Sequence, residues 1–162
     1  MPFVVKLENC EGHSEGRDMR KMFALCTATV LLLLILLTVG CQSAAVQHND
    51  RGVALTTEGG YDEAIAEFSK AIELEPEYVV AYSNRGYAYG LKGEWDIAIA
   101  DFDKAIELAP DYVLAYNNRG YAYEWQGEYG KAIADFEMVI KLSQDPSQIE
   151  NARQRIEELQ SQ

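Results

Sequence analysis

The stretch AYSNRGYAYGLKGEWDIAIADFDKAIELAP, Ala81–Pro110, is almost rewritten in the segment that follows it, AYNNRGYAYEWQGEYGKAIADFEMVIKLSQ, Ala115–Gln144. Aligned without a gap, residues 79–112 and 113–146 are identical at 19 of 34 positions. A fixed period of this length is typical of solenoids built from small helical hairpins. The repeat therefore predicts an all-α fold in which each hairpin packs against its neighbours.

The period also carries a pattern of residue types: a small residue at position 8, aromatics at 11 and 24, alanines at 20 and 27, and proline at 32. Residues 79–112 match it at every position, with Gly86, Tyr89, Ala98, Phe102, Ala105 and Pro110. Residues 45–78 and 113–146 match it at most positions. This pattern resembles the tetratricopeptide repeat, and the resemblance implies a right-handed superhelical solenoid of three helical hairpins.

Single positions of the repeat have mechanical roles. Gly86 and Gly120 allow the two helices of a hairpin to approach closely, and Gly93 and Gly127 suit the left-handed conformation that ends a helix. Residues 147–160 carry apolar residues at helical spacing and are predicted as a final helix that caps the stack, with Ser147 and Glu150 as its capping box.

A separate segment precedes the repeats. Phe23–Gly40 is an 18-residue run without a charge, preceded by Arg20 and Lys21, which is typical of a signal-peptide core or a minimal membrane span. The residues that lead to Cys41 resemble the lipobox of bacterial lipoproteins. The resemblance implies that residues 19–40 are removed as a signal peptide and that Cys41 is lipidated. An uncleaved membrane anchor is the alternative.

Two expectations follow from this segment. The repeats would lie outside the cytoplasm on the cell envelope, and at the outer membrane if the host has one, because Gln42 rather than Asp follows the cysteine. Residues 1–18 fit no signal-peptide pattern, and Met19 would begin a short basic region directly before the apolar run. We therefore interpret residues 1–18 as a mis-called start or a disordered leader.

Charge excludes one class of partner. The net charge of −12 resides entirely in residues 42–162, which hold 22 acidic and 10 basic residues, whereas the first 41 residues are neutral. Such a field repels phosphate backbones, so nucleic-acid binding is not expected. The three cysteines lie outside the repeats, which rules out a disulfide or thiolate metal site within them.

The family resemblance implies a binding groove lined by positions 2, 5, 6 and 9 of the first helix of each repeat. Asparagine at these positions suits an extended peptide because its amide both donates and accepts hydrogen bonds, and tyrosine offers a rigid ring with a polar tip. The predicted peptide-binding residues are Asn49, Asp50, Ser83, Asn84, Tyr87, Asn117, Asn118 and Tyr121. The alternative is that these are ordinary solvent-facing helix residues.

One binding mode of the family is not expected. Its clamp for the carboxylates of chaperone tails needs Lys or Arg at several of positions 2, 5 and 6, and this chain has neither there. Arg51, Arg85 and Arg119 stand instead at position 7, where we expect them to pair with neighbouring acids. A cationic ladder for an acidic ligand is the alternative.

No nucleophile–base pair, metal-ligand cluster or phosphate-binding loop is recognisable, so no catalytic residue, metal or cofactor is predicted. His48 is interpreted as a packing or surface residue of the first repeat. The sequence favours a non-enzymatic adaptor that binds a protein or peptide partner and is anchored to a membrane. The alternative is a structural module that assembles with copies of itself.

Overall fold

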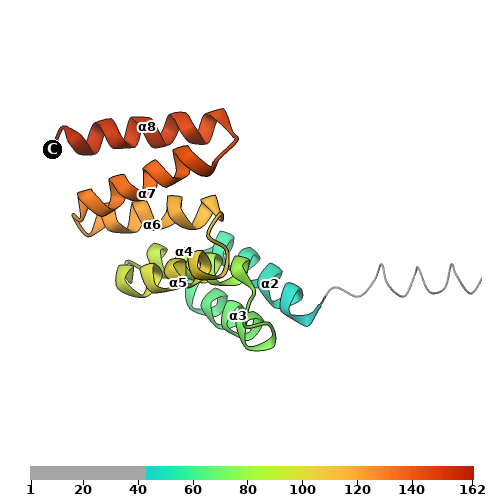
Figure 1. The fold of residues 1–162 in the computed structure, drawn as a ribbon. Coiled ribbons are helices and arrows are strands. Elements are labelled where there is room, and N and C mark those ends of the chain that lie inside the picture. The colour runs from blue at the N-terminus through green and yellow to red at the C-terminus, as the bar shows by residue number, and fades with distance from the viewer. Residues whose placement is uncertain (1–42) are drawn as a thin grey trace, which may run out of the picture. The chain divides into compact units, whose positions relative to one another are not determined.

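The computed structural model describes residues 43–162, and these residues contain helices and no strand. The predicted leader, the signal or membrane segment and the lipidation residue Cys41 lie outside the described residues. The helices are α2 (Ala44–Glu58), α3 (Tyr61–Leu74), α4 (Val79–Leu91), α5 (Trp95–Leu108), α6 (Val113–Trp125), α7 (Tyr129–Leu142) and α8 (Pro146–Gln160). Figure 1 shows them as successive antiparallel hairpins, which confirms the all-α solenoid.

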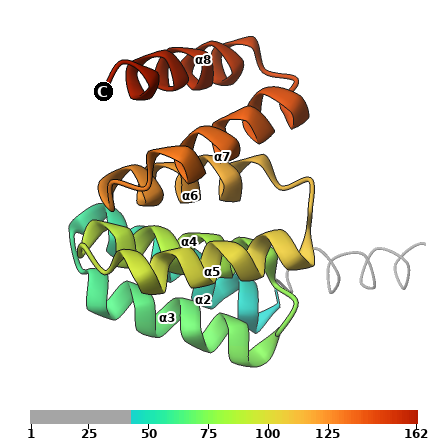
Figure 2. The ribbon, with the colours of Figure 1, turned by 60° about the vertical axis from the view of Figure 1, so that its left-hand side comes forward.

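The hairpins stack in chain order. Figure 2 shows α2 and α3 at the bottom, α4 and α5 above them, α6 and α7 next, and α8 at the top. Residues Ser43–Gln162 form one compact unit by their internal contacts. We therefore treat residues 43–162 as a fragment that folds by itself. None of the helices in this fragment has the length and apolar composition that crossing a bilayer requires.

Glycines end the first helix of each hairpin. Gly59, Gly93 and Gly127 have φ angles of 86°, 80° and 76°, and no other described residue has a positive φ. This left-handed conformation allows backbone N–H groups to satisfy the last carbonyls of the helix, as Gly59 does with the carbonyls of Leu55 and Thr56. The prediction for Gly93 and Gly127 is therefore confirmed.

The core lies between the two helices of each hairpin and continues into the next. Phe68, Phe102 and Phe136 are almost completely buried at equivalent positions. A Cβ atom added at Gly86 would lie 2.8 Å from Cε1 of Phe102, so the glycine is what allows α4 to approach α5. Phe102 also packs in one cluster with Ala122 of the following repeat. A single hairpin therefore leaves part of its apolar surface for its neighbour to cover.

The final helix covers the open side of the third repeat. Ala152 and Leu159 of α8 join Phe136 and Val139 in one buried cluster. The helix begins at Pro146, one residue earlier than predicted, and its cap is Asp145, whose carboxylate accepts a hydrogen bond of 2.9 Å from the backbone N–H of Ser147. The predicted capping box of Ser147 was wrong because proline, which lacks an N–H and has a fixed φ, is well suited to the first helical position.

Candidate functional site

The first helix of each hairpin lies on the inner side of the stack. Helix α2 contacts α4, and α4 contacts α6, whereas no comparable contact joins α3 to α5 or α5 to α7 in residues 43–162. First helices that lie closer together than second helices bend the stack toward themselves. We use the term inner surface for the exposed side chains of α2, α4 and α6 at positions 2, 5, 6 and 9 of each repeat.

Six of the predicted binding residues are accessible on or beside the inner surface. Asp50 and Tyr87 are exposed, and the other four are partly exposed: Asn84, Asn117, Asn118 and Tyr121. Apolar side chains lie among them, because Val53, Val80 and Leu114 are exposed as well. The inner surface therefore combines apolar contact area with amide and phenol groups.

Asn49 and Ser83 are not accessible. Both stand at position 5 of their repeats, and their exposed fractions are 5% and 1%. Nδ2 of Asn84 donates a hydrogen bond of 2.9 Å to Oδ1 of Asn49, so these two amides join the first repeat to the second. Burial raises the pKa of the Tyr112 phenol, and the nearby hydroxyl of Ser83 lowers that pKa by a smaller amount. In the first two repeats position 5 is thus buried, so Asn49 and Ser83 are not accessible groove residues as predicted, whereas Asn117 at position 5 of the third repeat is partly exposed.

Two of the three arginines at position 7 form ion pairs with aspartates, as the sequence led us to expect, and they also contact the preceding repeat. Arg85 donates from Nε and Nη2 to the two carboxylate oxygens of Asp101, at 2.8 and 2.7 Å. Its Nη1 reaches Ser69 of the preceding repeat at 3.1 Å. The guanidinium also lies over the ring of Tyr82, at 5.6 Å from the ring centroid. One side chain therefore ties together both helices of its own repeat and the repeat before it.

The third repeat reproduces this bridge. Arg119 donates to both carboxylate oxygens of Asp135, at 2.8 and 2.7 Å, and to Asp103 of the preceding repeat. Burial raises the pKa of Asp135, because desolvation outweighs the hydrogen bonds from Arg119, and these hydrogen bonds raise the pKa of Arg119. The sequence contains two signals for these arginine–aspartate bridges. Arginine and aspartate recur at the same two positions of both repeats, and Asp101 and Asp135 interrupt helix faces that are otherwise apolar.

Arg51 departs from the pattern. It is exposed and has no ion pair within the described residues, so the prediction of pairing holds for Arg85 and Arg119 and is wrong for Arg51. The acid that would be its partner, Glu67, binds His48 at 2.6 Å and Lys70 at 2.6 Å instead. These hydrogen bonds, first that of Lys70 and then that of His48, lower the pKa of Glu67.

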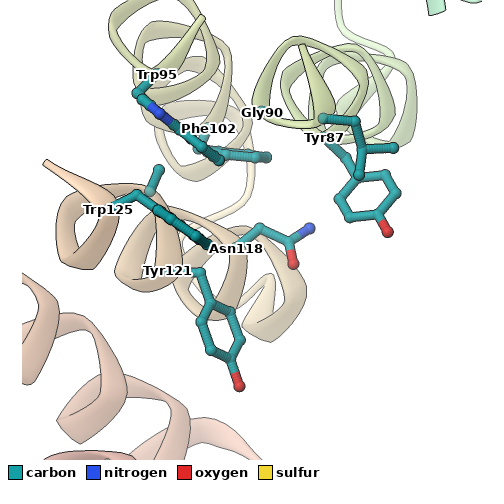
Figure 3. A pocket seen from close by; sticks show the side chains of 9 residues that line it. Tyr87, Gly90, Trp95, Phe102, Asn118, Tyr121 and Trp125 are labelled. Carbon is teal, nitrogen blue, oxygen red and sulfur yellow. The ribbon is translucent and has the colours of Figure 1, made fainter. Parts of the chain in front are cut away.

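A pocket of about 180 Å³ opens between the second and third repeats. Figure 3 shows Trp95 and Trp125 together at one side of it and Tyr87 at the other. The two indoles are stacked, with ring centroids 5.6 Å apart and planes within 3° of parallel. Asn118 and Tyr121, both among the predicted residues, line the same pocket. The tryptophans were missed because the family pattern assigns no role to either position.

A second hollow, of about 120 Å³, lies between α6, α7 and the final helix. Leu114, Asn117 and Tyr121 line it from α6, and Gln148 and Asn151 line it from α8. The accessible predicted residues of the third repeat thus gather around two neighbouring pockets, and Tyr121 borders both. Neither Asp50 nor Asn84 lines either of these two pockets.

Cations are scarce on the inner surface. Of the ten basic residues among residues 43–162, all except Arg51 and Lys141 form ion pairs with acids, and neither exception stands at position 2, 5, 6 or 9. Residues 43–162 also contain no group of three side chains suited to a metal ion. The chemistry that the inner surface offers is therefore apolar contact, amide hydrogen bonding and negative charge.

The repeats match models of known protein families. Residues 79–112 and 113–146 each match the tetratricopeptide repeat, and residues 52–93 match a second description of the TPR repeat. No curated protein matches the chain.

Solved structures of TPR domains are similar to the chain. The second TPR of Spaghetti (RPAP3), bound to the HSP90 peptide SRMEEVD, is 31% identical, with a TM-score of 0.61, over 62% of this chain and 94% of that one. The second TPR domain of human RPAP3, in complex with the HSP70 peptide SGPTIEEVD, is 28% identical, with a TM-score of 0.66, over 72% and 95%. The TPR2B domain of yeast Sti1 in a pHsp70 complex is 25% identical, with a TM-score of 0.70, over 73% and 97%.

Proposed function

The chain belongs to the tetratricopeptide repeat family, and on this premise we propose that it is a non-enzymatic adaptor that binds a segment of a partner protein on its inner surface. The observation that carries the proposal is the accessible set of amides, phenols and apolar side chains along α4 and α6, which ends in the pocket between the second and third repeats. Extended or helical segments are recognised by surfaces of this composition.

The partner segment differs in charge from the peptides of the similar structures. The HSP90 and HSP70 peptides in those structures end in EEVD and are acidic. An acidic tail needs cations that are free to bind it, and the arginines of the second and third repeats are occupied by Asp101 and Asp135. We therefore expect the peptide SRMEEVD not to bind residues 43–162 measurably in calorimetry, and a tight complex would contradict the proposed charge preference.

The binding surface is tested by a pull-down from host envelope extract with residues 43–162 as bait. The test variant is Tyr87→Ala with Asn118→Ala, since both side chains are accessible and neither forms a hydrogen bond that the fold requires. The control variant is Glu73→Ala with Leu74→Ala, which removes exposed side chains of α3. A partner lost only from the test variant supports the inner surface, and a partner retained by both variants moves the site elsewhere.

The proposal includes a place for the adaptor. Lipid attached to Cys41 would hold the repeats at the cell envelope, outside the cytoplasm, and two or three acyl chains anchor stably where one does not. Mass spectrometry of membrane extracts tests this directly. We expect an N-terminal peptide that begins at an acylated Cys41. An intact N-terminus at Met1 with an unmodified Cys41 would contradict both the lipoprotein reading and the later start at Met19.

A second candidate function is self-assembly, and one observation favours it. Arg85 and Arg119 each reach back to the preceding repeat, whereas Arg51 borders an open hollow of about 560 Å³ on α2 and α3 together with Leu55 and Glu58. A further hairpin, from a second copy, would fit that position. Light scattering of residues 43–162 over a range of concentrations decides between the two, because a strictly monomeric fragment would exclude end-to-end stacking of this unit.

A further inference from the structure

Both tryptophans of the chain line the pocket between the second and third repeats. Trp95 is the first residue of α5, and Trp125 is the last residue of α6. The third repeat has Tyr129 where the second has Trp95, and the second has Leu91 where the third has Trp125. The stacked pair therefore does not follow from the repeat pattern and belongs to this one boundary between repeats. We call it the tryptophan pocket.

Several large apolar side chains of the tryptophan pocket are exposed. Trp125 is 72% exposed, and Leu91 and Tyr87 beside it are exposed as well. Exposed clusters of large apolar side chains mark interaction sites in soluble domains. In another protein, a dry apolar cavity of about 150 Å³ accepts benzene. The volume of about 180 Å³ found here is therefore sufficient for one aromatic ring or one large aliphatic side chain.

Polar groups in the tryptophan pocket and in the hollow next to it indicate what accompanies that side chain. Asn118 lines the pocket, and its amide has no hydrogen-bond partner within the described residues, so it is available to a peptide backbone. Gln126, next to Trp125, donates from Nε2 to Oδ1 of Asp96, next to Trp95, at 2.7 Å. No cation pairs with Asp96 in the described part of the chain. Asp96 and Gln126 line, together with Trp95, an adjoining hollow of about 280 Å³, so a carboxylate lies in the hollow that shares Trp95 with the tryptophan pocket.

We propose that the tryptophan pocket holds one aromatic or large aliphatic side chain of the partner segment, and that Lys or Arg beside this anchor is attracted to Asp96. Charge complementarity supports a basic segment, because the fragment is strongly acidic and the inner surface has no free cation. The proposal rests on the proposed adaptor function and adds to it the residue chemistry of the ligand and the residues that select it.

The ligand chemistry is tested by selecting peptides from a random phage-displayed library on residues 43–162. We expect the selected peptides to share an aromatic or large aliphatic residue with Lys or Arg close to it, and to be poor in Asp and Glu. The tightest peptide is then synthesised and titrated into the fragment. Because the only two tryptophans of the chain are in the pocket, we expect their fluorescence emission to shift saturably as the peptide binds.

The site is tested with single variants and a labelled form of the same peptide, whose anisotropy does not depend on the tryptophans. Trp125→Ala should weaken binding at least tenfold without loss of helix content, since that side chain is mostly exposed. Leu74→Ala, which removes an exposed apolar side chain from α3, should bind as the parent does. Asp96→Asn should weaken binding by about threefold to tenfold. Its control is Glu137→Gln, an exposed acid on α7 that should have no effect.

Each contrary result identifies what fails. If the selected peptides bind Trp125→Ala as tightly as the parent, the tryptophan pocket is not the site, while the adaptor function stands. If they are predominantly acidic, the assigned ligand chemistry is wrong. If the library yields no saturable binder, the pocket proposal fails, and the pull-down with the Tyr87→Ala and Asn118→Ala variant decides the adaptor function separately. If the fragment self-associates and Trp125→Ala abolishes that association, the occupant is a second copy and the proposed partner is overturned.

Discussion

The first repeat and the two that follow it place an arginine at the same position, yet the three arginines have different surroundings. Arg85 and Arg119 lie over tyrosine rings and hold buried aspartates. Arg51 is exposed and has no ion pair in the described residues. The difference arises at two other positions of the first repeat. His48 replaces the tyrosine, and Glu67 replaces the aspartate.

These two replacements act together. The longer side chain of Glu67 reaches His48 and Lys70, and the imidazole takes the place of the ring on which a guanidinium would lie. In the later repeats, the guanidinium groups lie over the rings of Tyr82 and Tyr116, and the aspartates pair with the arginines. We therefore expect an arginine at position 7 to stabilise the fold only if its repeat also has the tyrosine and the aspartate that contact it.

The largest change in stability is expected when the ion pair between Arg119 and Asp135 is removed from the third repeat. Arg119→Met keeps the apolar stem but leaves Asp135, which is 4% exposed, as a buried carboxylate without its cation. Breaking such a pair lowers the free energy of unfolding by about 3–5 kcal/mol. Arg51→Met should change it by less than about 0.5 kcal/mol, as exposed substitutions usually do. Urea unfolding of residues 43–162 measures both.

A companion variant separates charge burial from packing. Arg119→Met with Asp135→Leu removes both members of the pair, and it should recover most of the stability that Arg119→Met loses, because no unpaired charge is left. If the double variant is as unstable as the single one, the role assigned to the buried carboxylate is wrong.

The close approach of paired helices also differs between repeats. A Cβ atom at Gly52 would lie 2.5 Å from Cε1 of Phe68, whereas at Gly120 the distance to Cε1 of Phe136 would be 3.0 Å. Alanine favours the helix over glycine by about 1 kcal/mol, and overpacking opposes this by about 1–3 kcal/mol. We expect Gly52→Ala to destabilise the fragment and Gly120→Ala to be nearly neutral in thermal unfolding, and the reverse order would contradict this difference in packing.

The first repeat can be converted to the pattern of the others. His48→Tyr with Glu67→Asp should give Arg51 both an aromatic face and a carboxylate, and should stabilise the fragment by about 1 kcal/mol. A double-mutant cycle in urea provides the measurement, because each single change alone should bring little or no gain. Equal effects of the single and double variants would show that the two positions do not act together.

The smallest expected effect is a difference in pH dependence. The lowered pKa of Glu67 means that its contribution to stability is present above the ordinary carboxyl value of 4.5 and is lost as the pH falls through the pKa of the folded state. The raised pKa of Asp135 has the opposite sign, so its contribution is lost as the pH rises. In urea midpoints between about pH 3 and 6, Glu67→Gln should flatten the rise of stability with pH, and Asp135→Asn should steepen it.

Much of the fold could be predicted from the sequence because its determinants recur within each repeat. Gly93 and Gly127 each follow the first helix of their repeat, and Phe102 and Phe136 each face the glycine at position 8 of theirs, because the period of 34 residues keeps these positions in phase. The candidate site was predictable in part. Of the residues predicted for the groove, Tyr87, Asn118 and Tyr121 line the tryptophan pocket, and their role in binding stays a prediction, whereas Asn49 and Ser83 are buried.

The sequence by itself determined the helical hairpins, their number, the positions that pack between them and the acidic balance that disfavours nucleic acid. These properties depend on residue type at a fixed spacing within one repeat. Only the tertiary structure decided that Asn84 binds Asn49, that Glu67 pairs with His48 and Lys70, and that Trp95 stacks on Trp125. The physical reason is that these contacts depend on the length and direction of side chains from different helices, which no spacing along one helix specifies.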